Sequence, residues 1–426
     1  MSAIRRELCV ALVGTGDELV EGRHLDTNSA EIARALIDIG FEPRRFTVLG
    51  DDEDELVHTL LELATGHGAI VITGGLGPTL DDITRHAVAR AAGVELVRDE
   101  SVLQGLRELF ARRGRPFAEA NVRQALFPRG AVVLPNANGT AAGFTCAVAG
   151  AHVYALPGPP REMRPMLTAL VLPRLAATVT GLPCVERRAS HLFGIPESAL
   201  ADAAGAWMAR DANPLVGVTA SGGRLSVSLR AEAPTRAAAV ALAEERAAQI
   251  RERFGAWLFS EDEPDLARAL GRELLARGVT VSIAESCTGG LAAERLTGVP
   301  GISAVFEYGF VTYANRAKIE LLGVDAELFA AHGAVSAPVA AAMARGAALR
   351  SGARLAVSIT GIAGPGGGSA EKPVGLVVFG IAADGVVTTE ERRFLDLGRD
   401  LVREFAANTA FDLLRRALRG LPDRPV

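Results

Sequence analysis

The sequence predicts an α/β protein of three parts: an N-terminal parallel-sheet three-layer domain, a small central α+β module and a C-terminal α/β domain. At 426 residues the chain exceeds what one ordinary hydrophobic core fills. Short β-rich runs alternate with amphipathic helical runs near both ends of the chain. With 49% apolar and 22% charged residues the composition is that of a globular protein. We place the three parts at residues 1–172, 173–260 and 261–426.

The first part alternates strands and helices, which favours right-handed crossovers and a parallel sheet with ligands at the strand carboxyl ends. The expected strands are Leu8–Val13, Phe46–Leu49 and Ala69–Thr73. The expected helices begin near Asn28, near Asp51 and after Asp82. The first places Ile32, Leu36 and Ile37 on one face, and the second carries Leu56, Leu60, Leu61 and Leu63.

The central module shows strand and helix signals but no cluster of catalytic side chains. Its expected elements are a strand at Ser190–Phe193, a helix at Pro196–Ala206, strands at Leu215–Thr219 and Leu225–Leu229, and an alanine-rich helix from about Pro234. Gly222 and Gly223 fall between the two later strands, where a hairpin turn is favoured over contact with RNA.

The third part begins with a helix from Pro264 to Gly278, whose apolar face carries Leu266, Leu270, Leu274 and Leu275. The preceding run Glu261-Asp262-Glu263 is interpreted as a solvated charge run with no further role. Further strands are expected at Val279–Ala284 and Leu355–Ile359.

Bulk properties exclude several function classes. A formal charge of −5 argues against direct nucleic-acid binding, which requires basic patches. The four cysteines have no spacing typical of a zinc site or a disulfide framework. No apolar run reaches the length of a membrane span, and Met1 to Arg6 leads into a strand, not a signal peptide, so we expect a cytoplasmic protein with no membrane partner.

Only two of the 45 basic residues are lysines, Lys318 and Lys372. An arginine can replace a lysine wherever a permanent positive charge is needed, but it cannot accept a proton near neutral pH. A lysine retained against such a bias is therefore a candidate for proton-transfer chemistry, although chance or a simple ion pair also explains one.

Ser286 lies where the strand before it turns through Glu285-Ser286-Cys287-Thr288-Gly289-Gly290 into a helix. Such a turn places hydroxyl and backbone N–H groups at a positive helix end, suited to a nucleophile or an anion, although helix capping by Ser and Thr is the alternative. Lys318 follows Tyr313 by five residues. We therefore predict Ser286 as nucleophile, Lys318 as base and Tyr313 as the group that orients them, with Cys287 as the rival nucleophile.

A glycine-rich stretch, Thr360 to Ser369, follows a strand and ends near Lys372-Pro373-Val374-Gly375. Its backbone can approach a ligand closely, as an anion nest or an oxyanion donor. His332 is interpreted as a loop or capping residue.

These motifs together resemble the CinA C-terminal family of nicotinamide mononucleotide amidohydrolases. The resemblance rests on Ala284 to Gly290, Val299-Pro300-Gly301, Val311 to Asn315 with Lys318, Gly333 to Ser336, Thr360 to Pro365 and Lys372 to Gly375. It implies metal-free hydrolysis of the nicotinamide carboxamide of nicotinamide mononucleotide (NMN), giving nicotinic acid mononucleotide and ammonia. The substrate-binding residues expected there are Thr288, Gly289, Gly290, Thr360, Gly361, Gly364 and Arg399.

Two departures from that family are small: Tyr308 replaces a usual glycine and is expected to affect only the pocket mouth, and Ala314 replaces a usual serine. To accept a proton, Lys318 must be neutral, which requires burial or a neighbouring cation. Arg399 or Arg403 is the candidate for that cation and for holding the substrate phosphate.

In the first part, the stretch from Thr73 through Gly74, Gly75 and Gly77 to Asp82 closes a strand and opens a helix. Glycines allow the main chain to wrap a phosphate, and Asp81 with Asp82 offers hard oxygen ligands for a divalent metal ion of unknown identity, although both are also ordinary helix caps.

With Gly16 to Leu19, Asp26 to Asn28, Asn138-Gly139-Thr140 and Leu156 to Met163, this stretch resembles the molybdopterin-binding-like domain at the front of CinA proteins. The resemblance implies pterin binding or metal-dependent hydrolysis of ADP-ribose at its pyrophosphate, and a glycine loop with aspartates favours the second. Ala142 replaces a common proline, so we expect a loosened loop there. The central module is expected to be KH-like.

The favoured hypothesis is a bifunctional enzyme of pyridine-nucleotide salvage, whose ligands are the nucleotides NMN and ADP-ribose. The alternatives are a scaffold or regulatory protein of competence or DNA-damage response, and a pterin-binding first domain without hydrolase activity. The resemblance also leads us to expect a homo-oligomer.

Overall fold

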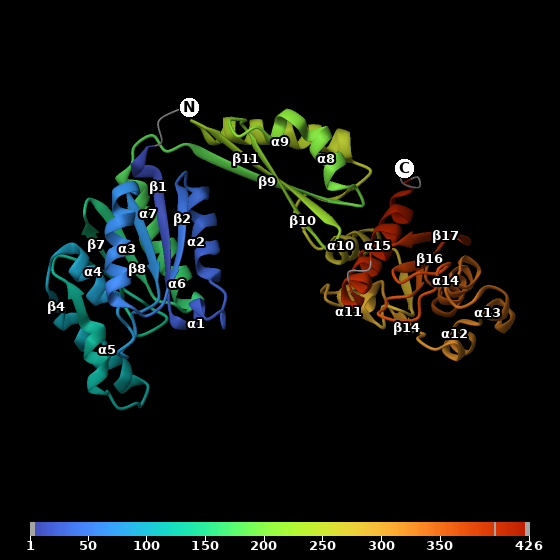
Figure 1. Cartoon of the computed structure of the whole chain (residues 1–426), viewed down its shortest axis with the longest axis horizontal. Coiled ribbons are helices and arrows are strands. Elements are labelled where there is room, and N and C mark those ends of the chain that lie inside the picture. The colour runs from blue at the N-terminus through green and yellow to red at the C-terminus, as the bar shows by residue number, and fades with distance from the viewer. Residues whose placement is uncertain (1–4, 396–397, 422–426) are drawn as a thin grey trace. The chain divides into compact units, whose positions relative to one another are not determined.

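The computed structural model describes residues 5–395 and 398–421, and these form two compact units (Figure 1). The first unit holds the chain up to Glu186 together with Glu232–Val240, and the second holds Arg187–Ala231 and the chain from Ala241. The part of the expectation for Met1 to Arg6 that concerns Met1 to Ile4 lies outside the described residues. In agreement with the sequence prediction, the protein is α/β.

The first unit is built on a six-stranded sheet of order β2-β1-β3-β8-β7-β6. Its strands are β1 (Cys9–Thr15), β2 (Glu42–Leu49), β3 (Ala69–Thr73), β6 (Val132–Leu134), β7 (Gly143–Val148) and β8 (Ala151–Leu156). The first four strands in that order pair in parallel, as predicted, whereas β7 and β6 pair antiparallel. The strand β7 runs antiparallel to β8 because only Ala149 and Gly150, both with positive φ, connect the two strands, and a two-residue turn permits only a hairpin.

Helices cover both faces of this sheet, which gives the expected three layers (Figure 1). They are α1 (Asp17–Val20), α2 (Thr27–Asp38), α3 (Glu53–Gly66), α4 (Thr84–Ala92), α5 (Glu100–Arg112), α6 (Pro160–Met166) and α7 (Leu172–Thr178). A small sheet of β4 (Leu96–Arg98) and β5 (Leu126–Pro128) lies beside α4. Alternate residues of β1 enter opposite cores: Val13 packs with α3 and α4, and Leu12 packs with α2 and α7.

Side-chain capping fixes the starts of the main helices. Asp26, Asp52 and Asp99 each accept a hydrogen bond from a backbone N–H in the first turn of α2, α3 and α5. Leu61, one of the leucines expected in this helix, is 42% exposed. Leu56, Leu60 and Leu63 follow the helical period into the core, and Leu61 is one residue off that face.

The central module has a four-stranded sheet of order β10-β11-β9-β12. Its elements are β9 (Cys184–Phe193), α8 (Glu197–Ala204), β10 (Leu215–Ser221), β11 (Arg224–Ala233), α9 (Arg236–Phe254) and β12 (Leu258–Ser260). The predicted hairpin at Gly222 and Gly223 is confirmed, and both glycines have positive φ. The Gly222 carbonyl accepts a hydrogen bond from Asn408 Nδ2, and a Cβ on Gly223 would meet the Phe405 ring. Turn geometry and close packing therefore account for both glycines.

The C-terminal part of the second unit has a five-stranded sheet of order β14-β13-β15-β16-β17. Its strands are β13 (Val281–Glu285), β14 (Tyr308–Val311), β15 (Leu355–Gly361), β16 (Leu376–Ala383) and β17 (Val386–Arg393). Its helices are α10 (Leu266–Arg277), α11 (Leu291–Thr297), α12 (Asn315–Leu322), α13 (Ala326–His332), α14 (Ala337–Ser351) and α15 (Arg399–Arg419). Strands β14, β13 and β15 are parallel, so their carboxyl ends meet at one edge.

The acidic run before α10 is not simply solvated, contrary to its interpretation from the sequence. Glu263 is 9% exposed, pairs with Arg272 at 3.0 Å and accepts from the Asp265 N–H at 3.1 Å. Glu261 pairs with Arg251 of α9 at 2.7 Å. The run therefore ties the start of α10 in place.

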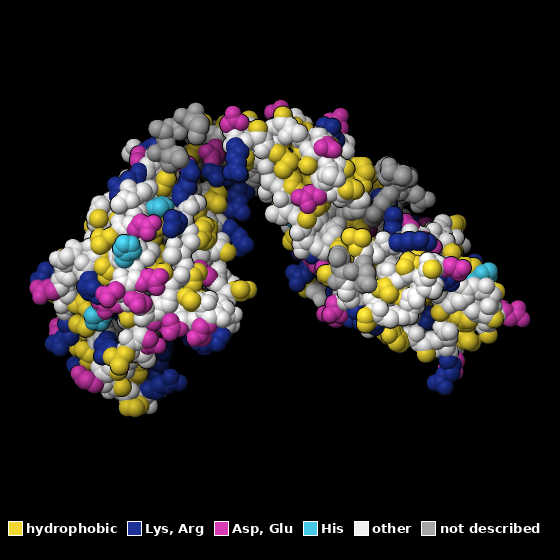
Figure 2. All heavy atoms as spheres, in the orientation of Figure 1, with side chains coloured by type: hydrophobic (Ala, Val, Ile, Leu, Met, Phe, Trp, Pro, Cys, Tyr) yellow, Lys and Arg dark blue, Asp and Glu magenta, His cyan; other side chains and the backbone are white. Residues whose placement is uncertain are grey.

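None of the described helices combines the length and the apolar character needed to span a bilayer. On the visible face of each unit, acidic and basic side chains are interspersed (Figure 2).

Candidate functional site

Parallel pairing of β13 with β14 brings Ser286 and Lys318 together. The register places Glu285 opposite Val311, so the residues that follow each strand meet at the carboxyl edge of the sheet. Lys318 then returns from the first turn of α12 and donates from Nζ to Ser286 Oγ at 2.9 Å. Both side chains are enclosed, with Ser286 9% and Lys318 1% exposed.

The contacts of the Lys318 amine are compatible with a neutral base. Nζ also lies 2.8 Å from the Thr312 carbonyl and 3.3 Å from the Tyr313 carbonyl. A neutral amine has two N–H groups for these carbonyls and one lone pair, which can accept the Ser286 hydroxyl proton. No carboxylate forms an ion pair with Lys318 in the described part of the chain.

Burial lowers the pKa of Lys318 below the ordinary 10.5. The one opposing influence is the Cys287 thiolate, whose negative charge would raise the pKa of Lys318. Burial, however, raises the pKa of Cys287 to about 12, so the thiol is neutral near pH 7 and this influence is removed. The sequence suggested burial or a neighbouring cation as the cause of a lowered Lys318 pKa. Burial is the cause found, and no cation among the described residues contributes.

The expected anion site at the start of α11 is occupied by the protein itself. The buried Glu285 carboxylate accepts from the N–H groups of Gly290, Ala292 and Ala293 at 2.8–3.0 Å. The amide N–H groups of Cys287 and Thr288, by contrast, enter no backbone hydrogen bond among the described residues. They follow Ser286 directly and are the available donors for an oxyanion on its substrate.

Tyr313 contributes to the site with its backbone and, separately, with its phenol. Its carbonyl faces the Lys318 amine, whereas its phenol oxygen accepts from Arg399 at 3.0 Å. Arg399 also donates to the Gly364 carbonyl at 2.8 Å. Arg403, the other expected phosphate-binding arginine, donates to the Thr288 carbonyl at 2.8 Å.

Other residues that the sequence analysis singled out in the C-terminal part hold the loops around this site in place. Thr360 donates to the Ala334 carbonyl at 2.9 Å, and Gly361 packs against β16 too closely for a side chain. Lys372 donates to the His332 and Val335 carbonyls at 2.7 and 2.8 Å, which joins two loops. The two lysines therefore differ: Lys372 binds carbonyls at the surface, and Lys318 is buried against a serine.

In the first unit, the glycine loop after β3 surrounds a cavity of about 760 Å³. Predicted residues that line it are Thr73, Gly74, Gly75, Gly77, Asp81, Asp82 and Thr140. Gly74 has a φ of +106°, and a Cβ there would lie 2.5 Å from the Thr15 carbonyl, so only glycine fits. Asn138 and Gly139 line an adjoining cavity instead.

Further polar residues line this cavity that were not among the predicted binding residues, among them Asn28, Asp51, Gln124 and Glu162. They come from separate elements, and only the sheet topology assembles them. Asn28 donates to the Gly158 carbonyl at 2.7 Å and Gln124 to Thr140 Oγ1 at 3.2 Å, while their side-chain oxygens have no donor among the described residues. Ala142 does not loosen its loop as expected, because it is 7% exposed and packs in the core.

The two aspartates expected to bind a metal ion have different surroundings. Asp82 accepts from the N–H groups of Gly77 and Thr79 at 2.6 and 2.8 Å, and from the Thr79 hydroxyl, so it closes the loop. Asp81 is exposed beside Asp51. Burial, with the charges of Asp17, Asp81 and Glu18, raises the pKa of Asp51. Among the described residues, no three His, Cys, Asp or Glu side chains form a ready metal cage.

Three models of known protein families match successive parts of the chain. Residues 263–418 match the family model "CinA C-terminal domain", residues 11–177 the "Probable molybdopterin binding domain", and residues 187–260 the "Damage-inducible protein CinA KH domain". The resemblance inferred from the motifs is therefore confirmed.

Relatives extend the similarity over the full length. A protein of Symbiobacterium thermophilum, named as competence-damage inducible, is 46% identical over 97% of this chain and 99% of its own. A CinA-like protein of Geobacter sulfurreducens is 42% identical, and the match covers 96% of this chain and 99% of that protein. The crystal structure of the competence/damage inducible protein CihA from Agrobacterium tumefaciens is 48% identical, covering 36% of this chain and 96% of that one with a TM-score of 0.35. The chain belongs to the CinA family.

Proposed function

We propose that the C-terminal site hydrolyses the carboxamide of NMN to nicotinic acid mononucleotide and ammonia. The observation that carries the proposal is the 2.9 Å contact between Lys318 Nζ and Ser286 Oγ, made by an amine whose pKa is lowered by burial. A serine with a base in hydrogen-bond reach is the arrangement that activates a hydroxyl for attack on an amide.

In the proposed reaction, Ser286 Oγ attacks the carboxamide carbon while its proton passes to Lys318 Nζ. The carbonyl oxygen becomes an oxyanion, for which the N–H groups of Cys287 and Thr288, directly after Ser286, are the candidate donors. The C–N bond then breaks, and Lys318 returns the proton to the departing ammonia. Water attacks the resulting ester with Lys318 again as base, which releases the acid and restores Ser286.

Arg399 is the residue best placed to recognise the anionic part of this substrate. It is exposed and bridges the Tyr313 phenol and the Gly364 carbonyl, so its guanidinium lies where two loops of the site meet. A guanidinium has five N–H donors, and those left over can bind a phosphate. Tyr313 is then held in place by its phenol while its carbonyl contacts the base.

We propose that the first unit hydrolyses ADP-ribose at its pyrophosphate with a divalent metal ion. Support comes from a cavity large enough for a nucleotide and lined by the glycine loop, including Asp81 and Asp82 just before α4. Asn28 and Gln124 offer oxygens that a ribose hydroxyl would satisfy. Pterin binding remains the alternative, and a flat ring makes less use of the wrapped glycine backbone.

The side chains of this cavity fit a metal ion that binds together with the substrate diphosphate. They fit less well an ion that is coordinated by protein side chains alone. Asp51 and Asp81, with Glu18 that also lines the cavity, are the candidate carboxylates to hold it, since the oxygens of Asp82 already close the loop. Magnesium-like ions are commonly bound by one or two carboxylates together with substrate phosphates and water. Bound there, the ion would supply Lewis-acid stabilisation of the phosphate oxygens.

Removing divalent metal ions should separate the two activities in one preparation of the full-length protein. With excess chelator, ammonia release from NMN should be unchanged, whereas AMP formation from ADP-ribose should fall to background and return with added metal. Coupled ammonia detection and chromatography of AMP measure the two reactions. Loss of ammonia release on chelation would contradict the serine–lysine proposal. Metal-independent AMP formation would contradict the proposal of a metal-dependent ADP-ribose pyrophosphatase.

A scaffold role in competence or damage response is the alternative that the names of the relatives suggest. A scaffold role does not require the contact between the buried Lys318 amine and Ser286. It therefore predicts that substitutions at Lys318 leave the cellular function intact.

A further inference from the structure

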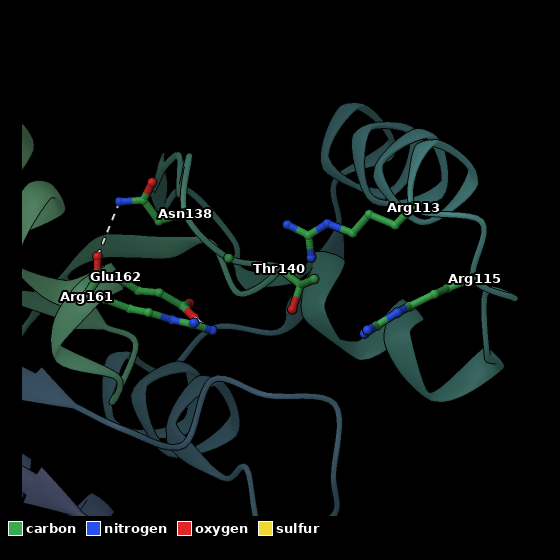
Figure 3. A pocket seen from close by; sticks show the side chains of 7 residues that line it. Arg113, Arg115, Asn138, Thr140, Arg161 and Glu162 are labelled. Atoms are coloured by element: carbon green, nitrogen blue, oxygen red, sulfur yellow. Dashed lines mark hydrogen bonds and ion pairs between the residues drawn. The ribbon is translucent and has the colours of Figure 1, made fainter.

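Three arginines line a second cavity, of about 800 Å³, directly beside the nucleotide cavity of the first unit. Figure 3 shows Arg113 and Arg115 extending from the end of α5 and the loop after it, and Arg161 extending from α6 on the opposite side. Thr140 and Glu162 line both cavities. One ligand can therefore reach from the glycine loop into the space between the arginines.

The turn that carries two of these arginines is held by specific contacts. Gly114 has a φ of +61°, and the Arg115 N–H bonds back to the Phe110 carbonyl at 3.0 Å, which ends α5 in a tight turn. The Phe117 ring then packs edge-on against Phe110, with 5.5 Å between ring centres. The backbone thus presents Arg113 and Arg115 toward Thr140 in a defined way.

Within the described residues, the guanidinium groups of Arg113 and Arg115 form no ion pair and no hydrogen bond. Nearby arginines differ, because Arg98 pairs with Glu100 at 2.6 Å and Arg129 pairs with Glu95. Arg161 has one carboxylate near it, Glu162 at 3.8 Å, and that carboxylate also accepts from Asn136 at 2.8 Å. All three arginines are exposed at the rim of this open cavity. With Glu162 as the one carboxylate among the described residues that line it, the cavity carries a net positive charge.

We propose that this cavity is a phosphate subsite, so that the first unit prefers nucleotide diphosphates that carry a further phosphomonoester on a sugar. The inference rests on the proposed function of the glycine loop, which would hold the diphosphate. Arginine forks match the oxygens of a phosphate, and two or three of them around one dianion form charge-assisted hydrogen bonds that a sugar hydroxyl cannot replace.

The test compares two probes, ADP-ribose and ADP-ribose 2′-phosphate, by calorimetric titration of the full-length protein with chelator present to prevent turnover. The wild type should bind the phosphorylated probe at least about tenfold more tightly. The double variant Arg113→Gln/Arg115→Gln should lose that preference but keep its affinity for ADP-ribose. Arg112→Gln, an exposed arginine on the same helix that does not line the cavity, is the matched control and should keep the preference.

Each outcome separates this inference from the function on which it rests. Equal binding of the two probes by the wild type, or an unchanged preference in the double variant, would overturn the phosphate subsite even if ADP-ribose is hydrolysed. An arginine-dependent preference without hydrolysis on adding metal would support the subsite and reject the pyrophosphatase. Failure of both probes to bind with chelator, and to bind or be hydrolysed once a divalent metal ion is added, would reject both proposals.

Discussion

Replacement of Lys318 by methionine is expected to lower the turnover of NMN hydrolysis by about 10²- to 10⁴-fold, the range typical of a lost general base. Methionine has nearly the length of lysine and no charge, so the buried site should accept it without an unpaired cation. Lys318→Arg should fail similarly, because a guanidinium cannot accept the Ser286 proton. Ammonia release measures the loss.

The matched control is Lys372→Arg, which changes the only other lysine. Lys372 donates to two loop carbonyls, a role that arginine can fill, so turnover should stay within about threefold of the wild type. Thermal unfolding verifies that each variant is folded. An active, folded Lys318→Met protein would show that this amine is not the base.

Ser286→Ala should lower amide hydrolysis by about 10³-fold or more, as expected when a nucleophile is removed. Cys287→Ala should keep activity within about threefold. The difference follows from the pKa of about 12 for Cys287, which leaves roughly one thiol in ten thousand ionised at pH 8. Assays well below the unfolding temperature avoid confusion with lost packing, since Cys287 is part of the core. An active Ser286→Ala beside an inactive Cys287→Ala would reverse the assignment of the nucleophile.

The proximity of Ser286 and Lys318 could be predicted from the sequence because each residue follows closely on a strand. A serine placed after one buried strand and a lysine placed shortly after the next are brought to the same sheet edge whenever the two strands pair in parallel, as β13 and β14 do. The sequence did not reveal that Glu285 occupies the N–H groups of α11. That role depends on the carboxylate turning back over its own loop, which no spacing pattern reports.

The first unit was predicted less completely, because its cavities draw on residues far apart in the chain. Asp82 and Asp81 are adjacent in sequence, yet one closes the loop and the other lies beside Asp51. Arg113 and Arg161 meet across a cavity only through the sheet and its connections. The antiparallel hairpin of β7 and β8 was missed although a two-residue turn with glycine marks it.

The most direct measurement of the central claim is the pKa of Lys318 in the folded protein. Lysine labelled with ¹³C at Cε gives only two such signals, and the Lys318→Met variant identifies which one belongs to Lys318. Because burial disfavours the charged amine, this signal should titrate below 10.5, and amide hydrolysis should rise with pH through the same range. A Lys318 pKa at or above 10.5, with hydrolysis independent of that titration, would contradict the account.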